Sequence, residues 1–111
     1  MRQIEHDEIK LRLDGMLFTW DDNKERINIR KHGIDFRAAA RVFVDIDAIL
    51  EFNSVDDYTG EERWDAIGLF DAGIVFVVYV ERTTVDDNDI IRIISARYAD
   101  RKEKKRYVFS Y

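Results

Sequence analysis

The spacing of apolar residues changes along the 111-residue chain, from helical in its first half to strand-like in its second. Phe36, Ala39, Ala40 and Phe43 recur at the i, i+3, i+4 and i+7 positions of one helix face. Just before them, residues 17–20 alternate weakly, which predicts a short strand. From position 48 onward the apolar residues fall in short alternating or continuous runs, and these predict several strands.

Capping residues set the predicted ends of two helices in the first half. Asp22 as N-cap with Glu25 three residues later is a capping-box pattern, and it predicts a helix that ends near His32. Gly33 follows and can adopt the left-handed conformation that closes helices. Asp35 is predicted to cap a second helix. Because only a few residues separate the two helices, we expect an αα-hairpin.

Four strands are predicted in the second half, at residues 48–53, 62–70, 74–82 and 90–97. The connections between them are a loop at 56–60, a tight turn at 71–73 and an acidic hairpin loop at 83–89, so we expect an antiparallel meander. The β-branched and aromatic segment 74–82 is predicted to be a central strand buried on both faces. Residues 100–109 are predicted to form a basic C-terminal helix.

This order of elements predicts an α+β fold in which helices pack on one face of an antiparallel sheet of three to four strands. No proline, repeat or low-complexity linker marks a boundary, so residues 1–111 are expected to form a single domain. Apolar residues make up 46% of the chain, enough for a core. The absence of cysteine excludes disulfides and thiolate metal sites, and we expect no metal and no cofactor.

The first 13 residues lack the apolar stretch of a signal peptide, and no apolar run approaches the length of a membrane span. We therefore expect a cytoplasmic protein. Its net charge of −5 is unevenly distributed, because residues 42–63 carry −6 whereas residues 90–111 carry +5. Such asymmetry is typical of a polyanion-binding face or of an acidic face for a basic partner. Ordinary solvated surfaces produce the same pattern.

For metal-independent catalysis the chain offers Glu, Lys, Arg, Tyr and one plausible His. Cleavage of RNA through its 2′-OH is one reaction that needs little more than these side-chain types. The reaction requires a base for that hydroxyl, cations for the pentavalent phosphorane and an acid for the 5′ oxygen. The chain has two histidines, His6 and His32, and His32 follows Lys31 at the end of the first predicted helix. Two interpretations of His32 stay open: a catalytic base, or a histidine that caps the helix beside the Gly33 turn.

Arginines end two of the predicted strands, at Arg82 and Arg97, and guanidinium groups suit phosphate oxygens. In the meander these two residues are expected at opposite ends of one hairpin, with Arg92 nearer to Arg82. A salt bridge between Arg82 and the acidic 86–89 loop is an equally simple interpretation. Glu62 and Arg63 place a carboxylate base beside a cation, although an exposed pair of little energetic worth has the same pattern.

The predicted C-terminal helix is the densest positive segment of the chain. Its cations and the adjacent aromatic residue are Arg101, Lys102, Lys104, Lys105, Arg106 and Tyr107. Such a helix beside Arg97 would attract RNA, although a solvated helix face explains the pattern as well. The tryptophans Trp20 and Trp64 are more simply core residues than platforms for stacked bases.

Several blocks of the sequence, in order and at compatible spacing over residues 16–107, resemble the signature of BrnT-type toxins. They are Phe18-Thr19-Trp20-Asp21-Asp22-Asn23-Lys24, Asn28, Lys31-His32-Gly33, Phe36, Ala39-Ala40, Phe43, Gly60-Glu61-Glu62-Arg63, Ile67-Gly68, Val77-Val78-Tyr79-Val80-Glu81-Arg82, Arg92-Ile93-Ile94-Ser95-Ala96-Arg97 and the charged run to Tyr107.

The resemblance implies a RelE-like fold and a ribonuclease that inhibits translation. It also implies a DNA-binding antitoxin of the BrnA type, through which the complex would repress its own operon. Catalytic positions would be Lys31, His32, Glu62, Arg63, Arg82, Arg97 and Tyr107, with RNA-binding cations at Arg92, Arg101, Lys102, Lys104, Lys105 and Arg106. Within this set, Glu62 or His32 is expected to be the base, and Arg82 and Arg97 to stabilise the phosphorane.

Two features depart from the family pattern. Residues 1–15 extend beyond its usual start, which makes Met16 an alternative initiator. The acidic 85–89 loop adds negative charge where RNA would approach. A homologue without catalysis, which only pairs with an antitoxin and co-represses transcription, is therefore the alternative function.

Overall fold

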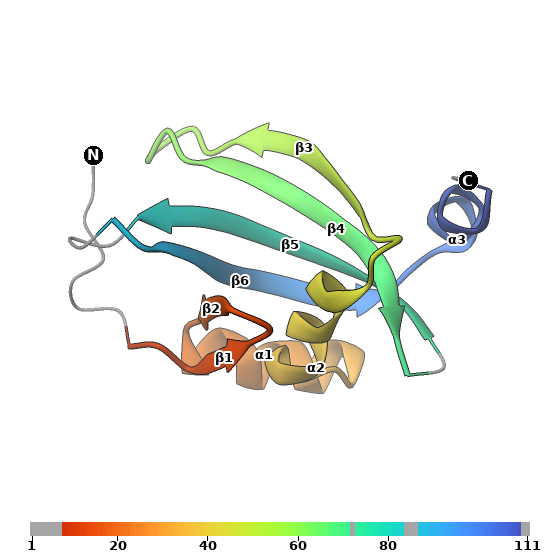
Figure 1. Ribbon diagram of the computed structural model, residues 1–111, viewed down its shortest axis with the longest axis horizontal. Coiled ribbons are helices and arrows are strands. Elements are labelled where there is room, and N and C mark those ends of the chain that lie inside the picture. The colour runs from red at the N-terminus through yellow and green to blue at the C-terminus, as the bar shows by residue number, and fades with distance from the viewer. Residues whose placement is uncertain (1–7, 72, 84–86, 110–111) are drawn as a thin grey trace.

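The computed structural model describes residues 8–71, 73–83 and 87–109. Within these residues, six strands form one sheet in the order β1-β2-β6-β5-β4-β3, with three α-helices and one 3-10 helix, η1 (Figure 1). The strands are β1 (Leu11–Leu13), β2 (Met16–Thr19), β3 (Ile49–Val55), β4 (Glu62–Phe70), β5 (Gly73–Thr83) and β6 (Asp89–Tyr98). The helices are α1 (Asp22–His32), α2 (Phe36–Ala40), η1 (Arg41–Val44) and α3 (Arg101–Val108).

The α+β class is confirmed, but the prediction of three to four antiparallel strands is wrong. The described part of the sheet has six strands and is mixed, because β2 runs parallel to β6 with Leu17 opposite Ile90. This pairing joins segments more than 70 positions apart, so no local sequence pattern predicts it. The additional strand β1 is only three residues long and lies within the segment interpreted as an N-terminal extension.

The helix ends follow the capping residues with one correction. Asp21, not Asp22, is the N-cap of α1, and its side chain accepts a hydrogen bond from the Lys24 amide at 2.9 Å. Glu25 instead accepts the Phe36 amide at 2.9 Å, which ties α1 to the start of α2. Gly33 ends α1 in the left-handed conformation, as predicted. The predicted Asp35 cap is also present, and the second helix continues as η1.

The hydrophobic core lies on one face of the sheet, beneath α1, α2 and η1. Val75, Val77 and Tyr79, at alternate positions of β5, are buried there with side chains of α2 and η1, and we call this face the helix side. On the opposite face, Val80 is buried whereas Phe76 and Val78 remain partly exposed, so the predicted burial of this strand on both faces is confirmed only in part. The reason is that α3 stands alone at one end of the sheet, apart from the other helices (Figure 1).

Within the described residues, none of the helices is both long and apolar enough to cross a membrane. The predicted loop at 83–89 is described only in part, because residues 84–86 lie outside the described ranges.

Candidate functional site

Four arginines share the face of the sheet opposite the helix side. Strand register establishes this, because directly paired residues project to the same face and successive residues alternate. Phe76 pairs with Arg97, Val80 with Arg92 and Arg82 with Ile90 along β5 and β6. On β4, Asp65 pairs with Val78, and Arg63 precedes it by two positions. We call the surface that carries Arg63, Arg82, Arg92 and Arg97 the arginine face.

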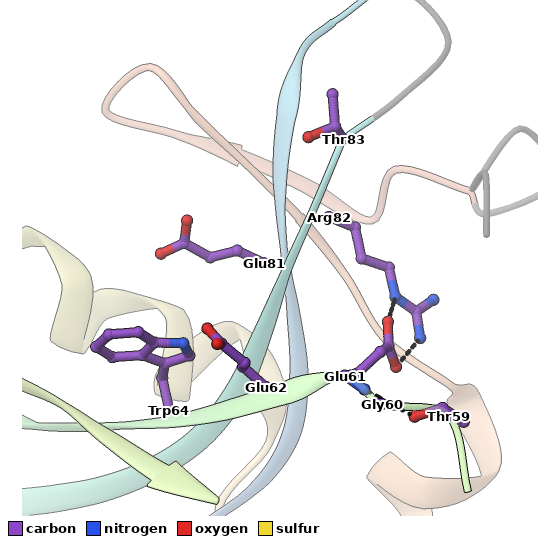
Figure 2. Close-up of a pocket in the computed structure, with 8 residues that line it drawn as sticks. All are labelled: Thr59, Gly60, Glu61, Glu62, Trp64, Glu81, Arg82 and Thr83. Atoms are coloured by element: carbon purple, nitrogen blue, oxygen red, sulfur yellow. Dashed lines mark hydrogen bonds and ion pairs between the residues drawn. The ribbon is translucent and has the colours of Figure 1, made fainter. Parts of the chain in front are cut away.

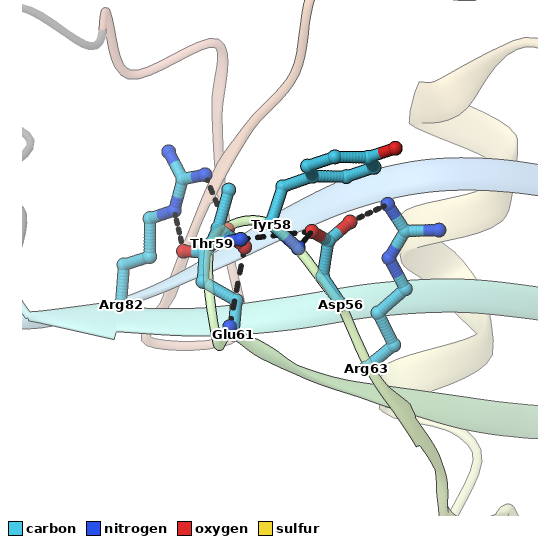
Figure 3. Close-up of polar contacts among 6 residues, drawn as sticks. All are labelled: Asp56, Tyr58, Thr59, Glu61, Arg63 and Arg82. Carbon is cyan, nitrogen blue, oxygen red and sulfur yellow. Dashed lines mark hydrogen bonds and ion pairs between the residues drawn. The ribbon is translucent and has the colours of Figure 1, made fainter.

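Two of these arginines bind acids of the β3–β4 loop, as Figure 3 shows. Arg82 donates from Nε and Nη2 to the two carboxylate oxygens of Glu61, at 2.8 and 3.0 Å. Arg63 donates from Nη2 to Asp56 at 3.0 Å. The sequence left a salt bridge between Arg82 and the 86–89 loop open; the structure shows Glu61 in a two-pronged ion pair with Arg82, and Asp86 of that loop lies outside the described residues. The loop therefore places a carboxylate against each of these two guanidinium groups.

Arg97 occupies the other end of the arginine face, so its predicted separation from Arg82 along the hairpin is confirmed. Its two terminal nitrogens donate to the two carboxylate oxygens of Glu103 on α3, at 2.8 and 2.9 Å. This bond from Arg97 lowers the pKa of Glu103. The guanidinium carbon also lies 4.2 Å from the centre of the Phe76 ring, a cation–π contact.

Asp65 is a buried carboxylate on the arginine face that the sequence analysis did not single out. Its side chain accepts a hydrogen bond from Nδ2 of Asn53 at 2.7 Å. Burial raises the pKa of Asp65, and the nearby Glu51 and Glu103 carboxylates add to that effect. Strand alternation could have placed Asp65 on the same face as Arg63, because the two residues are two positions apart in β4. The sequence around Asp65 nevertheless does not distinguish a functional role for this carboxylate from a purely structural one.

The predicted basic helix α3 is held against the sheet by polar contacts. Tyr107 is buried, and its hydroxyl donates to Oδ2 of Asp45. Arg106 binds both carboxylate oxygens of Glu51 on β3. Tyr107 therefore docks the helix, and its hydroxyl is engaged there. The remaining predicted cations of the helix are exposed: Arg101, Lys102, Lys104 and Lys105.

Lys31 and His32 lie at the border of the arginine face. They line a groove of about 170 Å³ together with Lys24 of α1 and with Ile94 and Ser95 of β6. That part of β6 connects Arg92 to Arg97. Both predicted residues are exposed at the end of α1, as a substrate-binding role requires. The other histidine of the chain, His6, lies outside the described residues.

A buried amide fixes α1 against β6 at this border. Nδ2 of Asn28 donates to the carbonyls of Ala96 and Ile34, at 2.8 and 2.9 Å. Oδ1 of Asn28 accepts the Ala96 amide at 3.0 Å. The pairing of β6 with β2 ends at Arg92, and beyond it the Asn28 side chain takes the place of a neighbouring strand. The amide thereby positions the helix end next to the strand that carries Arg97.

Glu62 projects to the helix side, away from the arginines. It is exposed and lines a pocket of about 540 Å³ with Trp64, Glu81 and other residues, at the start of β4 and the end of β5. Figure 2 shows Glu62, Glu81 and Trp64 on one side of the strands and the Arg82–Glu61 pair on the other. The structure thus places the four arginines on one face and brings Lys31 and His32 to its border. Glu62 projects from the other face, although it lines the same pocket as Arg82.

The two tryptophans behave as packing residues. Trp20 is 5% exposed and meets the Phe36 ring edge-on, with ring centres 5.9 Å apart. Trp64 is partly exposed and packs edge-on against Phe52 at 5.8 Å. The interpretation of Trp20 as a core residue is therefore confirmed. In the described ranges, no three histidine, aspartate or glutamate side chains are grouped so as to hold a metal ion.

A comparison with protein families matches residues 20–103 to the family described as "Ribonuclease toxin, BrnT, of type II toxin-antitoxin system". A comparison with curated proteins gives no match. The matched range includes the four arginines of the arginine face as well as Lys31 and His32. It ends at Glu103, the partner of Arg97, before the exposed cations in the rest of α3.

Proposed function

This chain belongs to the BrnT family of type II toxin–antitoxin ribonuclease toxins, and on that premise we propose that it cleaves RNA on the arginine face, without a metal ion. The observation that carries the proposal is the alignment of Arg63, Arg82, Arg92 and Arg97 on the one face that α1 and α2 leave open. A surface of guanidinium groups is suited to a phosphodiester backbone.

The geometry of the ion pairs supports phosphate binding. Arg82 and Arg97 each hold a carboxylate through two hydrogen bonds, and a phosphodiester offers the same pair of oxygens. Incoming RNA would displace Glu61 and Glu103 from these guanidinium groups. Arg97 and its neighbours would then stabilise the negative charge that develops on the phosphorane.

We assign the role of base to His32. It would take the proton of the 2′-OH, the 2′ oxygen would form a bond to phosphorus, and the bond to the 5′ oxygen would break as that oxygen gains a proton. The products would be a 2′,3′-cyclic phosphate and a 5′-OH. His32 is preferred to Glu62 because it lies beside β6, whereas Glu62 projects to the helix side. Lys31 and Arg92 would contribute positive charge at the same border.

The family implies a protein antitoxin as partner. We further propose that this antitoxin is of the BrnA type and binds operator DNA, that RNA cleavage inhibits translation in the cytoplasm, and that the fold is RelE-like. The exposed cations of α3 would attract RNA to the site. One observation favours the alternative of a catalytically inactive homologue: Arg63, Arg82 and Arg97 all hold carboxylates of the same chain.

Induced expression in a bacterial host tests the proposal. Wild type is expected to arrest growth and degrade cellular RNA, whereas Arg97→Ala relieves both effects. Arg41→Ala is the matched control, because Arg41 is an exposed arginine of η1 on the helix side. If folded wild-type protein leaves growth and RNA intact, the ribonuclease proposal fails and the inactive homologue is favoured.

A further inference from the structure

Strand β3 presents a row of exposed apolar side chains at the edge of the sheet. Leu50, Phe52 and Val55 are 55%, 50% and 51% exposed. They project to the helix side, because they pair with Ala66, Trp64 and Glu62 of β4 respectively. The helices that cover this side lie over other strands (Figure 1). We call these three residues the β3 row.

The outer edge of β3 is also open to another strand. In the described part of the chain, β3 pairs with β4 alone and is the last strand of the sheet. An open edge offers a line of amide and carbonyl groups that an extended peptide can bind. An apolar row next to such an edge supplies the side-chain contacts that strand addition needs.

Negative charge flanks one end of the β3 row. Val55 is paired with Glu62, which lines the 540 Å³ pocket together with Glu81 and Trp64. Arg82 lines the same pocket, but its charge is matched by Glu61, so Glu62 and Glu81 leave the pocket acidic. Glu62 and Glu81 lie on the same side of the strands as the Trp64 ring (Figure 2). These carboxylates repel RNA, and a second copy of the chain would bring its own carboxylates against them. A lysine or arginine next to the indole complements both the charge and the aromatic face.

We propose that the β3 row and its acidic pocket form the docking surface for the antitoxin, which adds an extended, basic segment as a seventh strand beside β3. Alternate apolar residues of that segment cover Leu50, Phe52 and Val55, and a cationic side chain enters the pocket beside Trp64. This inference rests on the proposed function in one respect, the existence of the antitoxin. At the β3 row, neutralisation is separable from catalysis, because Leu50, Phe52 and Val55 lie on the face of the sheet opposite the arginine face.

Binding measurements with purified proteins test the docking surface. The probe is the protein encoded by the reading frame adjacent to this gene, titrated into wild type, Phe52→Lys and Glu81→Arg by calorimetry. Loss of a central interface anchor typically costs about 2 kcal/mol or more, so Phe52→Lys should weaken binding about 30-fold. Glu81→Arg should weaken it as well, and because Glu81 is exposed this variant does not depend on repacking. Ile29→Lys, a 43% exposed apolar residue of α1, is the matched control and should bind like wild type.

Hydrogen exchange supplies a second readout. In the complex, the amides of residues 49–55 should exchange more slowly than in the isolated chain, because an added strand occupies the open edge. RNA cleavage by isolated Phe52→Lys should match wild type.

The outcomes separate the inference from its premise. If Phe52→Lys and Glu81→Arg bind as tightly as wild type, or β3 exchange is unchanged, the docking surface is wrong while the ribonuclease stands. If wild type itself does not bind the probe, the antitoxin premise and the inference fall together. If the β3 amides become protected by self-association without the probe, a second copy of the chain is the occupant and the proposal is overturned.

Discussion

Replacing Asn28 by alanine should cost this domain a large part of its stability. Asn28 is 5% exposed, and its side chain makes three hydrogen bonds, two to Ala96 and one to Ile34. Alanine removes all three and leaves backbone groups at the end of β6 without these partners. Each such bond contributes about 1 kcal/mol net, so we expect a loss of about 3 kcal/mol. Small domains have only about 5–15 kcal/mol in total.

Urea unfolding followed by circular dichroism measures this loss. With a slope of about 1–3 kcal/mol per molar urea, the midpoint should fall by about 1–3 M. Asn28→Asp is nearly equal in volume and keeps the acceptor for the Ala96 amide, but it turns a carboxylate toward two carbonyls. It should therefore destabilise at least as much as alanine. Asn23→Ala, an exposed asparagine on the same helix, should change stability by less than about 0.5 kcal/mol.

The expected order of stabilities among these variants follows because the Asn28 side chain bonds the backbone of β6 as a neighbouring strand would. A loss below about 1 kcal/mol for Asn28→Ala, or an Asn28→Asp variant as stable as wild type, would contradict this reasoning. In either case the carbonyls and the amide would be satisfied in another way, and the explanation for the placement of His32 beside β6 would have to be withdrawn.

Three further predictions concern the packing of η1 and the docking of α3. Gly68→Ala should lower stability by about 1–3 kcal/mol in thermal unfolding, since overpacking a core costs this much. Its new Cβ would stand 2.8 Å from Cγ1 of Val42 and 3.3 Å from Cβ of Ala48. Asp100→Ala removes the N-cap and capping box of α3, so it should cost about 1 kcal/mol and accelerate hydrogen exchange in that helix. The hydrogen bonds from Arg97 hold the pKa of Glu103 below its usual 4.5, so the stability that this carboxylate contributes is present above that pH and is lost as the pH falls. Urea unfolding across pH should therefore show Glu103→Gln less stable than wild type near neutrality, with the difference shrinking below pH 4.5; a constant difference would argue against the pair.

Local sequence signals predicted the elements that depend on neighbouring residues. Strand β4 spans Glu62–Phe70, as expected from its apolar run, and α3 begins after the Asp100 cap. Both are decided within a few positions of the chain by alternation or by capping. The Asp35 cap and the left-handed Gly33 were predictable for the same reason.

Contacts between distant segments could not be predicted in this way. The parallel pairing of β2 with β6 and the bond between Asn28 and Ala96 join residues far apart in the chain. The partners of the arginines are of the same kind, since Arg82 binds Glu61 from 21 positions away. Strand alternation puts Glu62 and Arg63 on opposite faces of the sheet. The sequence did not show which of these faces the helices cover, so it could not tell which residue lies on the open face.

The central claim, that RNA is cleaved on the arginine face, is tested most directly by purified protein and a 5′-labelled RNA in the presence of a metal chelator. We expect products that end in 2′,3′-cyclic phosphate and 5′-OH. Arg97→Ala and His32→Ala should each reduce the rate by at least about a hundredfold, the usual scale for loss of a general base or of a group that stabilises the transition state. Arg41→Ala and Glu62→Gln, both on the helix side, should retain the wild-type rate. Cleavage that survives Arg97→Ala but is lost in Glu62→Gln would place the site on the helix side and rule out cleavage on the arginine face.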